Sequence, residues 1–140
     1  MVKDDDICHL ITTILIEVLL MMLSNAISKT IPNDFVNYKT TPLFTKTNIP
    51  KMFLFEHNTK AGVFGQICVS QGELKFYGFS ERRGRVDQEV VIKSGEFAVS
   101  PPEYWHKVEF LTDDTAFEVK FYAQKDSEIV KQCLSERNGS

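Results

Sequence analysis

Hydrophobic and polar residues alternate in short runs between Lys51 and Tyr122. Alternation with a period of two is typical of strands that bury one face and expose the other. Turn-forming residues such as Gln71-Gly72 separate the runs. The pattern predicts strands at residues 52–57, 63–70, 73–80, 89–92, 97–100, 105–111 and 116–122. A series of short strands joined by tight turns indicates a β-barrel or a β-sandwich.

The same alternation predicts which side chains share a face with the two histidines of this region. His106 falls on the same side of its strand as Val108, and His57 on the same side as Phe53 and Phe55. Both imidazoles are therefore expected on apolar, inward faces, where the strands of a barrel can bring them to one opening. Neutral imidazoles bind metals or transfer protons. The alternative is that each ring is a packed residue that donates to a backbone carbonyl.

The two ends of the chain differ from this central region. Residues 7–23 are almost wholly apolar, with polar residues at helical spacing, so residues 1–23 are predicted to be an apolar, helical N-terminal extension. A helix packed on the barrel, a membrane span and a secretory signal are the alternatives, but Glu17 is costly in lipid and Asp4 to Asp6 do not suit a signal peptide. The barrel is assigned to residues 24–125. A short C-terminal helix and tail are assigned to residues 126–140, from the helical spacing of Ile129, Val130, Cys133 and Leu134.

Composition limits the partners that can be expected. A chain of 140 residues that is 43% hydrophobic is long enough for one domain with a core. Its net charge of -3 and scattered basic residues give no positive stripe for phosphates, so no nucleic acid is expected. The 3 cysteines are far apart in sequence, which suggests no disulfide framework and fits a reducing cytoplasm.

One stretch resembles a known metal-site motif. The series Gly95, Pro101 and His106 is similar to the second cupin motif, with Glu103 at a position where cupins usually have glycine. The first cupin motif is not matched, because Gly65 stands where cupins place a glutamate ligand. The resemblance implies a mainly β fold: a single cupin-like, antiparallel β-barrel of the jelly-roll type. It does not supply a complete set of four metal ligands.

A closer resemblance is to the tellurite-resistance TehB/YeaR-like domain family. Five segments carry it, in order between Tyr38 and Tyr122: His57–Val63, Gly72–Phe76, Gly95–Val99, Pro101–Glu109 and Thr112–Asp114. The family implies a compact β-barrel, found alone or attached to a tellurite-resistance methyltransferase. The chain shows no glycine-rich strand–turn–helix for S-adenosylmethionine, so methyl transfer is not expected from it.

These observations give a set of candidate site residues. His57 and His106 are the expected metal ligands, for a divalent transition metal such as Zn, Fe or Ni. Together with Lys60 and Tyr77 they are also the expected ligand-binding residues. Candidates for a third metal ligand are Glu56, Gln66 and Glu73.

Three function classes follow. The first is a barrel that binds a small molecule or a metal ion in an oxyanion or metalloid stress response. The second is a small cupin-type metalloenzyme, which would need at least three preorganised ligands and an open coordination position. The third is a self-associating barrel that forms a homodimer. A membrane partner is not expected.

Overall fold

The computed structural model describes residues 9–19 and 30–139. The chain divides into two compact units, Met1–Thr30 and Ile31–Ser140, and each is described by itself. In the first unit residues 9–19 form an α-helix in which every residue is exposed. The rest of the predicted extension lies outside the described residues. Within the described ranges, no helix is both long enough and apolar enough to cross a membrane.

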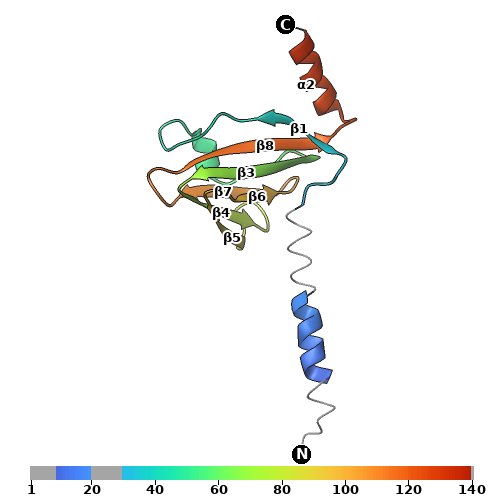
Figure 1. Ribbon diagram of the computed structural model, residues 1–140, viewed down its shortest axis with the longest axis vertical. Coiled ribbons are helices and arrows are strands. Elements are labelled where there is room, and N and C mark those ends of the chain that lie inside the picture. The colour runs from blue at the N-terminus through green and yellow to red at the C-terminus, as the bar shows by residue number, and fades with distance from the viewer. Residues whose placement is uncertain (1–8, 20–29, 140) are drawn as a thin grey trace, which may run out of the picture. The chain divides into compact units, whose positions relative to one another are not determined.

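The second unit consists of two four-stranded antiparallel sheets (Figure 1). One sheet has the order β1-β8-β3-β6 and the other the order β2-β7-β4-β5. This alternation of the chain between two facing sheets is the jelly-roll arrangement, so the predicted fold type is confirmed. The strands are β1 Phe35–Thr40, β2 His57–Asn58, β3 Val63–Gln71, β4 Glu73–Phe79, β5 Val86–Lys93, β6 Phe97–Ser100, β7 Trp105–Phe110 and β8 Ala116–Gln124.

The structure makes the expected barrel more specific, because it is not closed. In the described residues the backbone hydrogen bonds form two separate four-stranded ladders rather than one continuous ring. The outer strands of one sheet, β1 and β6, are not paired with the outer strands of the other, β2 and β5. The unit is therefore a β-sandwich whose two sheets enclose the core.

The predicted strand over residues 52–57 is also corrected. Lys51–Leu54 forms a 3-10 helix, η1, and β2 is only two residues long. Pro50 precedes the helix, and the Phe53 amide donates to its carbonyl at 3.1 Å, which closes a turn where a strand was expected. The alternation count consequently failed for Phe55, which is 68% exposed.

The core lies between the two sheets and follows the alternation of the strands. In β3 and β4 buried residues alternate with partly exposed ones, as predicted. Phe117 is fully buried and packs against Phe44 and Phe110, with ring centroids 5.7 and 5.8 Å away. Other members of this cluster are Ile67, Val69, Leu74, Phe76, Ile92, Ala98, Val108 and Val119.

The C-terminal helix, α2 (Glu128–Asn138), packs on β1 and β8. Its buried residue Val130 joins a second apolar cluster with Tyr38, Val63 and Ala123. Two side chains of the helix also donate to the carbonyl oxygen of Tyr38, the Cys133 thiol at 3.2 Å and the Arg137 guanidinium at 2.9 Å. These contacts fix the helix to the edge of one sheet.

Glu103, which stands where cupins usually have glycine, has a backbone conformation that glycine favours. Its φ is +61°, in the left-handed region that favours glycine. Its amide donates to the Thr59 carbonyl at 2.8 Å, which ties the β6–β7 turn to the loop after β2. The turn leads directly into β7, which carries His106.

Candidate functional site

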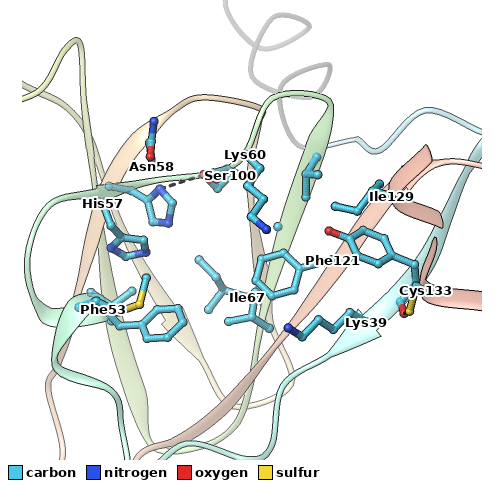
Figure 2. A pocket seen from close by; sticks show the side chains of 18 of the residues that line it. Lys39, Phe53, His57, Asn58, Lys60, Ile67, Ser100, Phe121, Ile129 and Cys133 are labelled. Carbon is cyan, nitrogen blue, oxygen red and sulfur yellow. Dashed lines mark hydrogen bonds between the residues drawn. The ribbon is translucent and has the colours of Figure 1, made fainter. Parts of the chain in front are cut away.

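A pocket of about 320 Å³ lies in the second unit (Figure 2). Both sheets, η1, the loop after β2 and α2 contribute to its walls, and most of the lining is apolar. The polar residues that line it include His57, Thr59, Lys60, Ser100 and His106. Pockets of this size with a few polar groups are typical of small-molecule sites.

His57 and His106 lie side by side in this pocket. They are directly opposite one another in the β2–β7 ladder, and their ring centroids are 4.1 Å apart with an angle of 63° between the planes. The expectation that the two histidines meet is thus confirmed. Phe53 packs edge-on against His57 at 5.1 Å, and Phe76 stacks on His106 at 5.4 Å. Aromatic rings therefore support the histidine pair from both sides.

Hydrogen bonds at Nδ1 of His106 determine which of its two ring nitrogens can accept a hydrogen bond from a ligand. The Nδ1 atom lies 2.8 Å from the Tyr104 carbonyl oxygen, which can only accept, so Nδ1 carries the hydrogen. Nε2 then carries the lone pair, and no residue of the described ranges donates to it. This nitrogen is also not fully buried. In the described residues, Ser127 Oγ is the only fully buried side-chain polar atom without a partner, so Nε2, which lacks one as well, must be accessible to solvent.

Two buried hydroxyl groups hold the His106 ring in place. Ser100 Oγ lies 3.1 Å from His106 Nδ1 and 2.9 Å from Thr59 Oγ1. Both hydroxyl residues are buried, and they come from β6 and from the loop after β2. The network joins the two sheets behind the imidazole, because β6 belongs to one sheet and β2 and β7 to the other.

Burial keeps both imidazoles neutral. It lowers the pKa of His106 to about 4, with a further contribution from the neighbouring His57, against the opposing effect of the Tyr104 carbonyl. Burial also lowers the pKa of His57, while the carbonyls of Phe55 and Met52 act in the opposite direction. At neutral pH the pair is therefore a set of uncharged acceptors in an apolar pocket.

The other predicted ligand-binding residues have different positions. Lys60 lines the pocket. Tyr77 does not, because it alternates with the buried Phe76 and lies on the outer face of β4, where its hydroxyl donates to Glu109 at 3.2 Å. The ammonium groups of Lys75 and Lys107 lie 4.9 and 5.2 Å from its ring centroid.

The candidates for a third metal ligand are not brought to the histidines. The Glu56 carboxylate accepts from the Arg83 amide at 2.8 Å, and Gln66 accepts from the Tyr122 hydroxyl at 3.0 Å. Glu73 lies at the start of β4 and, like the other two, does not line the pocket. Across residues 9–19 and 30–139 there is no group of three or more His, Cys, Asp or Glu side chains that could hold a metal ion.

Several residues that line the pocket were not foreseen from the sequence. Tyr38 and Lys39 come from β1, and Ile129 and Cys133 come from α2 (Figure 2). The C-terminal helix was predicted, but its contribution to the pocket depends on its packing against β1, to which no sequence signal points. Phe121 also lines the pocket, and it lies on the same face of β8 as Phe117 and Val119.

Comparison with known proteins agrees with this architecture. The family model for the TehB-like domain matches residues 39–119. The Escherichia coli protein YeaR, described as uncharacterized, is 35% identical over 96 residues, which are 66% of this chain and 81% of that protein. A probable S-adenosyl-L-methionine-dependent methyltransferase, TehB of Haemophilus influenzae, is 35% identical over 100 residues. That match covers 71% of this chain but 35% of TehB, so the chain spans about a third of the relative's length.

Solved structures give the same result. A crystal structure of an Escherichia coli protein superposes with a TM-score of 0.65 and 34% identity, over 67% of this chain and 95% of that one. The crystal structure of TehB from Haemophilus influenzae superposes with a TM-score of 0.64 and 35% identity, over 77% of this chain and 36% of that one. The family match includes the histidine pair and the strands that hold it. The chain belongs to the TehB-like family.

Proposed function

We propose that the β-sandwich is a small-molecule binding module whose polar anchor is Nε2 of His106. The observation that carries the proposal is a buried, neutral imidazole whose Nδ1 is occupied by the Tyr104 carbonyl and whose Nε2 has no partner in the described residues. Such a nitrogen accepts a hydrogen bond from an N–H or O–H group of a ligand. The apolar walls then hold the rest of the molecule by excluding water.

Family membership supports a role for this binding module in an oxyanion or metalloid stress response, together with TehB-type methyltransferases. Binding is favoured over catalysis, because the polar groups around His106 are arranged to hold its ring. Ser100 bonds to Nδ1, and Thr59 bonds to Ser100. An imidazole that activates a nucleophilic side chain would need that side chain within hydrogen-bond reach of Nε2, and no described residue donates to this nitrogen.

A neutral fluorescent probe tests this function. N-phenylnaphthylamine has an apolar body and one N–H donor, and we expect saturable binding of one dye to the protein. Replacement of His106 by asparagine keeps an amide donor near the Tyr104 carbonyl but removes the acceptor at the position of Nε2. Loss of one neutral hydrogen bond, about 1 kcal/mol, should weaken binding about fivefold in a fluorescence titration.

The matched control is Tyr77→Phe, which removes a hydroxyl group on the outer face of β4 and should leave dye affinity unchanged. The N-methylated dye, which has no N–H group, should bind the unsubstituted protein and His106→Asn with equal affinity. An affinity for the parent dye that is the same in His106→Asn and in the unsubstituted protein would refute the role of Nε2, provided that both melt cooperatively.

A transition-metal ion is the second candidate ligand. The observation that favours it is the Nδ1–carbonyl hydrogen bond of His106, since metal-binding histidines are oriented in this way by their other nitrogen. His57 and His106 are the residues that would hold the ion, which would supply a Lewis acid in the pocket. With two imidazoles and no third ligand in the described residues, the fit is incomplete and the binding weak.

Calorimetric titration of tag-free protein with Zn²⁺ separates this candidate from the first. Two neutral ligands leave the remaining coordination positions to water, so we expect weak binding that a chelator reverses fully. His106→Asn should abolish it. Heat that is indistinguishable between this variant and the unsubstituted protein would place any bound zinc elsewhere on the chain.

A further inference from the structure

Two lysines from distant parts of the sequence border the pocket. Lys39 lies on β1 and Lys60 in the loop after β2, and both line the cavity. Figure 2 shows both side chains extending over the cavity, in the region of Phe121. Both residues are exposed, so their ammonium groups remain in water until a ligand enters. The pocket therefore has positive charge at its border and apolar side chains within.

No carboxylate within the described residues neutralises these two lysines. In the described residues the lysines that form ion pairs are Lys46, Lys75, Lys120 and Lys131. Neither Lys39 nor Lys60 forms an ion pair within those ranges. Their charges are thus available to a ligand.

The balance of charge around the pocket is positive. Among the described residues, Glu136 is the only acidic side chain that lines it. Two lysines against one glutamate leave an excess of one positive charge, although the whole chain carries a net charge of -3. A local excess of the opposite sign to the whole protein favours an anionic ligand at this site over other parts of the surface.

We propose that the pocket selects small organic anions. The ligand class is a compact molecule with an apolar body and one anionic oxygen group, such as a carboxylate or a sulfonate. The body packs against Ile67, Val119 and Phe121, while the anionic group lies between the ammonium groups of Lys39 and Lys60. The inference rests on the proposed function, because it names the chemistry of the molecule that the same pocket binds.

The apolar body and the anionic group of the ligand contribute differently to the binding free energy, both in size and in their response to salt. Burial of an apolar body contributes about 25 cal/mol per Å² and does not depend on ionic strength at moderate salt. An exposed ion pair contributes little by itself and is screened by salt. Two ammonium groups on one anion add their effects, so the anionic group acts mainly on selectivity and the apolar body mainly on affinity.

A pair of dyes with one scaffold tests the inference. Anilinonaphthalene sulfonate carries a sulfonate that N-phenylnaphthylamine lacks. We expect the unsubstituted protein to bind the sulfonate dye more tightly than the neutral one at low salt, and the difference to shrink as salt is raised. The double variant Lys39→Gln/Lys60→Gln should bind the sulfonate dye about tenfold more weakly and the neutral dye within about twofold of the unsubstituted protein.

Lys107→Gln is the matched control, because it removes one positive charge from the outer face of the β2-β7-β4-β5 sheet, near Tyr77. It should leave the affinity for both dyes unchanged. Equal binding of the sulfonate dye by the double variant and the unsubstituted protein, with the neutral dye still bound, would overturn anion selectivity and leave the proposed function intact. If neither dye binds the unsubstituted protein saturably, the proposed function itself fails, and this inference with it.

Discussion

Acidification of the metal-free protein from pH 7 to pH 4 is expected to lower its free energy of unfolding by about 3 kcal/mol through His106 alone. The folded protein holds the pKa of this imidazole at about 4, whereas an unfolded chain has a histidine pKa near 6.5. Below pH 6.5 the unfolded state therefore binds a proton that the folded state excludes. The stabilisation is complete above this pH and is lost progressively down to pH 4.

Urea denaturation at a series of pH values measures this effect. His106→Asn is the control, because asparagine does not titrate and its amide can still donate to the Tyr104 carbonyl. His57 faces His106 across the ladder and its pKa is also lowered, so the variant should keep a smaller dependence on pH in the same window. A parallel loss of stability in both proteins would mean that His106 takes up its proton as easily when folded as when unfolded.

The strands that were predicted well have a buried face with a clear period of two. β3, β4, β7 and β8 begin at the predicted residues and end within two residues of the predicted ends. In each, apolar side chains on alternate positions must face the core, and this constraint is written locally in the sequence.

The elements that were missed lack this local signal. β5 begins at Val86, whereas the predicted strand begins at Glu89. The first residues of β5 are exposed and mostly polar, so the sequence shows no apolar alternation there. Residues 52–57 contain enough apolar residues for a strand, but Pro50 starts a turn, and the run is too short to fix a period.

The residues of the candidate site also divide into those that local alternation predicts and those that depend on contacts between distant segments. The inward direction of His106 followed from Val108 on the same strand, and the structure confirms it. Alternation also placed Tyr77 opposite the buried Phe76, so its position on the outer face could have been read from the sequence. The contribution of Lys39 could not, because it depends on β1 pairing with β8 and on α2 closing one wall of the pocket, and both are contacts between distant segments.

Replacement of Gly72 by alanine should destabilise the protein by about 3 kcal/mol. Gly72 joins β3 to β4 with φ of +70°, a conformation that costs an alanine about 1 kcal/mol or more. A Cβ atom there would also lie 2.3 Å from Thr112 Oγ1 and 2.8 Å from the Thr115 Cα. Thr115 cannot move away freely, since it is fully buried and its hydroxyl donates to the Glu73 carbonyl at 2.8 Å.

Gly95→Ala separates the two causes of this loss. Gly95 has φ of +87°, but a Cβ atom there would have no neighbour within 4 Å, so only the backbone cost of about 1 kcal/mol should appear in urea denaturation. Equal losses in the two variants would show that the turn around Thr112 adapts to the added methyl group.

Residues at the start of β3, among them Val63 and Gly65, line the pocket, whereas Gly72 follows the last residue of that strand. Folded Gly72→Ala protein should therefore bind N-phenylnaphthylamine within about twofold of the unsubstituted affinity, because the added methyl group perturbs a part of the sandwich that does not line the pocket.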